Sequence, residues 1–133
     1  MVLVERQGIP VGLTITAASP AEVRLAEPTL NSRVLPHRRL PRWLIADLAY
    51  DSDPLRARLA ARHVTLISPH RINRIRPSQD GRHLRRYRAR WIVERTIAWF
   101  GAFRRLVVRY ERSTHMYLAF FQLASALIAL RRL

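Results

Sequence analysis

The sequence WLIAD at residues 43–47 places an acidic residue at the end of a continuous apolar run. Four apolar residues in succession indicate a buried central strand that stops at Asp47. Cap residues before Pro54 predict a helix after this strand, and residues 63–68 predict a further strand. Strands that alternate with helices favour an α/β layer fold, whose open sheets carry active sites beyond the carboxyl ends of their strands.

The segments before this strand predict a hairpin and a helix. Residues 2–5 form a short apolar run, and apolar residues alternate with small or polar ones over residues 11–15, as in half-buried strands. The sequence SPAE at residues 19–22 is typical of a capping box, which predicts a helix from about Pro20. We expect Pro28 to end or bend this helix.

Two long helices are predicted in the last third of the chain, over about residues 84–108 and 114–132. No linker or internal repeat divides the sequence, so we expect residues 1–133 to form a single domain. The first predicted strand begins beside residue 1. We therefore expect a truncated domain in which the opening strand of the sheet is missing.

The charge of the chain indicates a polyanionic partner. The 133 residues include 24 basic residues, all of them arginine, and 9 acidic ones, which gives a formal net charge of +15. So much positive charge destabilises the folded chain by self-repulsion, which usually indicates a polyanionic partner. Nucleic acid is the expected partner, and an acidic membrane surface is the alternative.

Other chemistries are excluded by what the sequence lacks. It has no cysteine, so disulfides, cysteine-based zinc sites and a thiol nucleophile are excluded. The longest nearly apolar stretch, residues 116–130, is short for a membrane span, and no signal peptide is recognisable. We expect a cytoplasmic protein without a membrane partner.

Two carboxylates are candidates for a catalytic role. Asp47 follows a strand, where it is either an active-site acid or a cap of the next turn. In a continuous helix, Glu94 shares one face with Tyr87, seven residues before it, and with Arg90, four residues before it. The alternative for Glu94 is an ordinary surface ion pair with Arg90 or Arg95.

The remaining acids and the histidines favour structural interpretations. Asp51 and Asp53 precede Pro54, where aspartate is a preferred helix cap. The histidines show no metal-ligand spacing, and we interpret all five as surface or loop residues: His37, His63, His70, His83 and His115.

A basic segment follows the last predicted strand. Eight arginines lie between Arg71 and Arg90, and arginine binds phosphate through paired hydrogen bonds. The alternative is a solvated, flexible loop. The residues predicted to contact DNA are Arg71, Arg74, Arg76, Arg85, Arg86, Tyr87, Arg90 and Arg95.

Two long blocks of the sequence resemble the DDE transposases of bacterial insertion sequences. Residues 44–52, LIADLAYDS, resemble the family's ADxxYDS block. Residues 90–112 resemble its RWxVERTxAWxxxFRRLxxRYER block, and residues 8–14 are similar to its opening hairpin. The basic residue often found seven positions after the glutamate is Gly101 in this chain, which puts that DNA contact in doubt.

The resemblance implies a ribonuclease-H-like (retroviral-integrase-like) mixed sheet with flanking helices. It also implies a site in which three acids bind two divalent metals, Mg²⁺ or Mn²⁺, for phosphodiester chemistry. Asp47 would be the second catalytic, metal-binding acid and Glu94 the third. The first acid lies in the family on the opening strand, upstream of the hairpin, so we expect it to be missing and the chain to be inactive alone.

Three functional interpretations stay open. The chain is the downstream product of a transposase split over two reading frames, a decayed remnant, or a non-catalytic basic protein that binds DNA or a transposase. The expected partners are DNA, as transposon ends and target, and either further copies of the chain or an upstream transposase product. Salt-dependent DNA binding without nuclease activity would favour the non-catalytic interpretation.

Overall fold

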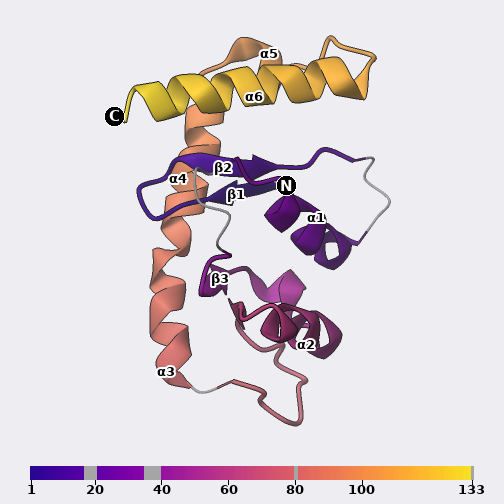
Figure 1. The fold of residues 1–133 in the computed structure, drawn as a ribbon, viewed down its shortest axis with the longest axis vertical. Coiled ribbons are helices and arrows are strands. Elements are labelled where there is room, and N and C mark those ends of the chain that lie inside the picture. The colour runs from indigo at the N-terminus through magenta and orange to yellow at the C-terminus, as the bar shows by residue number, and fades with distance from the viewer. Residues whose placement is uncertain (17–20, 35–39, 80, 133) are drawn as a thin grey trace. The chain divides into compact units, whose positions relative to one another are not determined.

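A computed structural model describes residues 1–16, 21–34, 40–79 and 81–132 (Figure 1). These residues group into two compact units. We call Met1–Leu35 with Trp91–Leu133 the terminal unit, and Pro36–Arg90 the central unit. The single-domain organisation expected from the sequence stays a prediction.

The terminal unit begins with the predicted hairpin. Strands β1 (Val2–Val4) and β2 (Pro10–Leu13) pair antiparallel, and their register shifts between Leu3 and Val4. The turn depends on Gly8, whose φ of +93° is a conformation that residues with a side chain rarely adopt. A Cβ at Gly8 would also lie 2.8 Å from Arg95 Nη2 and 3.2 Å from the Trp99 ring.

A short helical segment follows the hairpin. It consists of the 3-10 helix η1 (Glu22–Leu25) and α1 (Ala26–Asn31). The predicted start of the helix at residues 19–20 lies outside the described residues. The prediction that Pro28 would end or bend the helix is wrong in one respect, because the helix does not end at Pro28. Pro28 is the third residue of α1, where a backbone N–H would have no partner within that helix.

Helix α4 (Trp91–Phe100), α5 (Arg104–Val107) and α6 (Thr114–Leu130) complete the terminal unit. In Figure 1, α6 lies along α5 and against β2, while α4 contacts β1. Their shared core consists of Phe100, Leu106, Ala124 and Ile128. Helix α6 carries no Asp, Glu, Lys or Arg, and several of its apolar residues stay exposed, among them Met116, Leu123 and Leu130.

The helix predicted over residues 84–108 is not continuous. It is divided into α3 (Gly81–Leu84), a 3-10 helix η3 (Arg85–Arg90), α4 and α5. In η3, four of six residues are arginine, and like charges three or four positions apart oppose a regular α-helix. After Phe100, the N–H of Gly101 bonds the carbonyls of both Ile97 and Ala98, which closes the last turn of α4.

In the central unit, the WLIAD stretch forms a strand as predicted. Strand β3 (Trp43–Ile45) pairs in parallel with β4 (Thr65–Ile67), and Ile45 lies opposite Ile67. The connection runs through η2 (Leu48–Tyr50) and α2 (Asp53–Ala61). β3 is less buried than its apolar sequence predicts: Trp43 is exposed, and the next two residues are half-buried.

Helix α2 supplies the core of the central unit. Ser52 is its N-cap and accepts a hydrogen bond from the Leu55 N–H at 3.4 Å, and Pro54 lies in the first turn. Leu55 and Leu59 are 0% exposed and pack with the apolar side chains of β4. This arrangement fixes the carboxyl end of β3 beside the carboxyl end of β4.

The described residues therefore form a mixed α/β structure, as expected. Its strands form two two-stranded sheets, one antiparallel and one parallel, within the parts of the chain that the structure covers. In those same parts, no helix is both long enough and apolar enough to cross a membrane.

Candidate functional site

Asp47 lies where the sequence predicted it, just beyond the carboxyl end of β3. The Ala46 N–H donates to the Ile67 carbonyl at 2.9 Å, and the Ser68 hydroxyl donates to the Asp47 carbonyl at 2.6 Å. The backbone of Asp47 is thus bonded to the first residue after β4. The half-buried acid and the start of the basic segment share one edge of the parallel pair.

The side chain of Asp47 caps the turn that follows it. Its Oδ1 accepts a hydrogen bond from the Ala49 N–H at 2.9 Å, at the start of η2. The turn-cap interpretation is therefore confirmed for one carboxylate oxygen. The metal-binding role of Asp47 stays a prediction.

Glu94 lies in the first turn of α4, where its side chain is exposed. It belongs to the terminal unit, whereas Asp47 belongs to the central unit. The face that Glu94 was predicted to share with Tyr87 and Arg90 assumes one continuous α-helix, and η3 interrupts it. Within the described residues, no three His, Asp or Glu side chains gather into a group able to hold a metal ion.

The most densely bonded acid of the central unit is Asp51, whose side chain is 2% exposed. Its Oδ1 accepts hydrogen bonds from Arg56 Nη2, His70 Nδ1 and Arg74 Nη1, each at 3.0 Å. Its Oδ2 accepts from the Arg71 N–H, also at 3.0 Å. The prediction that Asp51 caps α2 is wrong, because Ser52 fills that position.

These contacts decide the charge of Asp51. Burial by itself raises the pKa of the carboxyl group, because it penalises the charged form. Hydrogen bonds from the Arg71 N–H, His70 and Arg56, together with the charge of Arg74, outweigh burial and hold the pKa of Asp51 well below its usual range. Asp51 is therefore a buried anion at neutral pH.

Arg56 joins this acid to the end of β4. Its Nη2 donates to the Ser68 carbonyl at 3.1 Å, and its Nη1 donates to the Leu66 carbonyl at 2.9 Å. Nη1 also donates to Gln79 Oε1 at 3.1 Å, so the guanidinium contacts both ends of the segment after β4. No local sequence signal indicates this cluster, because its members come from distant positions in the chain.

The residues predicted to contact DNA fall into two groups. Arg71, Arg76, Arg85 and Arg86 have exposed side chains. Arg86 stacks on the Trp43 ring at 4.3 Å from its centroid, which leaves the residue at the surface beside β3. These exposed guanidiniums are in position to meet a phosphate.

The other predicted contacts are held by the protein itself. Arg74 is bonded to Asp51 and Asp53, and its side chain is 16% exposed. Arg90 donates to the Tyr87 hydroxyl at 2.8 Å. In the terminal unit, Arg95 lies over the rings of Trp91 and Trp99 and donates to the Gln7 carbonyl at 3.0 Å.

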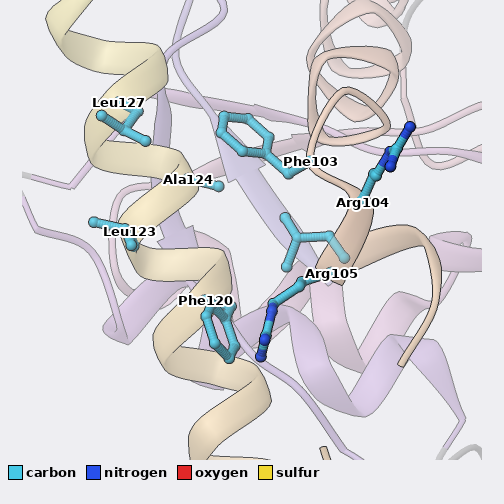
Figure 2. A pocket seen from close by; sticks show the side chains of 8 residues that line it. Phe103, Arg104, Arg105, Phe120, Leu123, Ala124 and Leu127 are labelled. Carbon is cyan, nitrogen blue, oxygen red and sulfur yellow. The ribbon is translucent and has the colours of Figure 1, made fainter. Parts of the chain in front are cut away.

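A separate hollow in the terminal unit opens between α5 and α6 (Figure 2). Its lining is almost entirely apolar, and Arg104 and Arg105 are its charged members. It contains no carboxylate or histidine, so it has none of the groups that metal-dependent chemistry needs. The lining residues are Phe103, Arg104, Arg105, Leu106, Phe120, Leu123, Ala124 and Leu127.

Comparison with known proteins agrees with the resemblance found in the sequence. Residues 1–129 match the Transposase DDE domain family, and the chain therefore belongs to the DDE transposases of insertion sequences. It is 32% identical over 134 aligned residues to a Burkholderia cepacia protein provisionally named the transposase of insertion sequence element IS402. The alignment covers 96% of this chain and 60% of that relative, so the chain spans less than two thirds of the relative's length. No solved structure matches.

Proposed function

We propose that the chain forms part of a ribonuclease-H-like DDE transposase catalytic domain. In this proposal Asp47 and Glu94 are the second and third metal-binding acids, and the exposed arginines after β4 and in η3 bind the DNA backbone. The bound divalent ions, Mg²⁺ or Mn²⁺, would stabilise the attacking and leaving oxygens of a phosphodiester.

The observation that carries the proposal is the shared edge of β3 and β4. Asp47 and Ser68 are bonded there at 2.6 Å, and the arginine-bearing segment leaves the sheet from the same point. The acid that binds the metal must act on the same stretch of DNA backbone as the arginines that hold the phosphates. Their common origin at the carboxyl edge of a parallel pair meets that requirement.

The acids of this chain do not complete a two-metal site. Asp47 and Glu94 are the two that match the family's motifs, and hard divalent cations need further oxygen ligands. Asp51 does not fit the role of the missing first acid, because its carboxylate is bonded to the guanidiniums of Arg56 and Arg74, whose positive charges repel a metal cation. We therefore propose that another transposase segment, in a longer product or a complex, supplies the first acid.

DNA binding is the part of this proposal that the chain can perform alone. Each phosphate contact releases condensed counterions, so the slope of log K against log salt should become less negative by about 0.9 per contact removed. Fluorescence anisotropy of a labelled duplex across a salt series measures this slope. The variant R71A/R76A removes two exposed guanidiniums, and its slope should change by about 2.

The control is R6A/R24A, which removes the same charge from exposed positions of the terminal unit. Its slope should stay close to that of the wild-type chain. Equal slopes for the two double variants would show that only net charge matters and would overturn the proposed surface. Nicking of plasmid DNA with Mg²⁺, abolished by D47N, would contradict the incomplete acid set.

A further inference from the structure

We propose that Asp51 is a positioning residue that fixes the arginine loop, which we define as residues 69–79, and thereby orients Arg71 and Arg76. The effect on DNA rests on the proposed function, whereas the effect on the loop does not. The position of Asp51 before Pro54 predicts only a capping role for it, and in the structure Ser52 has that role.

The first support is the reach of the carboxylate along the chain. Its partners His70, Arg71 and Arg74 lie 19, 20 and 23 positions away and all belong to the arginine loop. A buried anion that accepts three hydrogen bonds from one loop holds that loop to the start of α2. The loop contains no regular helix or strand in its described residues, so these bonds are a main source of its order.

The second support is a division of labour between two arginines. Asp51 binds the backbone N–H of Arg71, and the Arg71 side chain stays exposed. Asp51 binds the guanidinium of Arg74 instead, and Asp53 binds it as well. Arg74 is therefore an anchor of the loop, whereas Arg71 is presented to the solvent, where phosphate can reach it.

The third support comes from His70, which joins the two ends of the loop. Its Nε2 lies 3.2 Å from the Ser78 N–H, which can only donate. Nε2 is thus the acceptor, and the ring proton of the neutral imidazole is on Nδ1, where it is donated to Asp51. The carboxylate and the imidazole together close the loop from residue 70 to residue 78.

The effect of D51N on DNA binding distinguishes a positioning role of Asp51 from a purely electrostatic one, because the two predict opposite changes in affinity. D51N removes a negative charge, which by itself strengthens attraction to DNA. If Asp51 positions the arginines, D51N should instead weaken duplex binding by about tenfold, despite the added positive charge. D53N is the matched control, since it adds the same charge at an exposed partner of Arg74 and leaves Asp51 intact.

Trypsin reports on the loop without DNA. Cleavage after Arg71 should be about tenfold faster in D51N than in the wild-type chain and change much less in D53N. Should D51N fail to fold by circular dichroism, R74M carries the test, because it removes a guanidinium anchor and keeps the stem. Cleavage after Arg71 should then be faster in R74M than in D53N.

The outcomes are separable. Unchanged cleavage after Arg71 in a folded D51N or R74M would overturn the positioning role. Faster cleavage together with tighter DNA binding by D51N would show that Asp51 anchors the loop, and would overturn the proposal that it orients the arginines toward DNA. A wild-type chain that binds no DNA, with faster cleavage in D51N, would overturn the proposed function and leave the anchoring of the loop supported.

Discussion

Replacing Thr96 by valine tests how the hairpin is joined to α4. Thr96 is 0% exposed, and its hydroxyl donates to the Gly8 carbonyl at 2.8 Å across 88 residues of sequence. Valine has nearly the same shape and helix propensity, so the change isolates the hydroxyl. The added methyl gains about 0.8 kcal/mol of burial, while the buried carbonyl left without its donor costs about 1–3 kcal/mol.

The net expectation for T96V is a loss of about 1–2 kcal/mol in the free energy of unfolding of the terminal unit. With a urea m-value of about 1–3 kcal/mol/M, the midpoint should fall by roughly 0.3–2 M. The assay is urea unfolding followed by tryptophan fluorescence in a W43F background. The remaining tryptophans, Trp91 and Trp99, both belong to α4 and report on the terminal unit.

T29V is the matched control. Thr29 is 2% exposed and also lies in the terminal unit, but its hydroxyl donates at 3.0 Å to another hydroxyl, that of the half-buried Thr14. The Thr14 hydroxyl can rotate toward water, so T29V should cost less than about 0.5 kcal/mol. Equal midpoints for T96V and T29V would refute the claim that the Gly8 carbonyl depends on Thr96.

Two further predictions concern the turn and the buried acid. G8A should destabilise the terminal unit by about 1–3 kcal/mol in the same urea assay, because φ is +93° and the new Cβ would press on the Trp99 ring. G81A, in the central unit and followed by Trp43 fluorescence, should be close to neutral, since its Cβ meets nothing within 4 Å, and equal effects of the two would contradict this reasoning. The pKa of Asp51 is lower in the folded chain than its ordinary value of 3.8, so its stabilising effect is present above that value and lost as the pH falls below it. The difference in unfolding free energy between wild type and D51N, followed by Trp43 fluorescence, should therefore shrink between pH 5 and pH 3, and a constant difference would contradict the assignment.

Local patterns in the sequence predicted most of the elements. The apolar run before Asp47 became β3, the Pro54 signal marked the first turn of α2, and the alternation over residues 11–15 located β2. Each of these signals depends on neighbours within a few positions, such as the Ser52 side chain that caps α2. The long helix at the C-terminus, α6, followed equally from its nearly apolar sequence.

Features that depend on distant partners were not predictable in this way. Asp51 was interpreted as a cap because Pro54 is near it in sequence, yet its partners lie in the arginine loop. His70 was interpreted as a surface or loop residue; it does lie in a loop, but its contact with Asp51, 19 positions away, was not predicted. The break at η3 was missed because hydrophobic periodicity was read over the whole of residues 84–108, and repulsion between arginines does not enter that pattern.

The uncharged helix α6 gives this arginine-rich chain a divided response to ionic strength. Added salt weakens the attraction between arginine and phosphate, so concentrated salt removes bound nucleic acid during purification. The exposed leucines of α6, with Leu123 at 58% and Leu130 at 66%, respond differently. Sulfate strengthens the burial of apolar surface, so it drives these faces together. Chloride at the lowest concentration that still strips nucleic acid is thus the condition in which the chain should stay monodisperse.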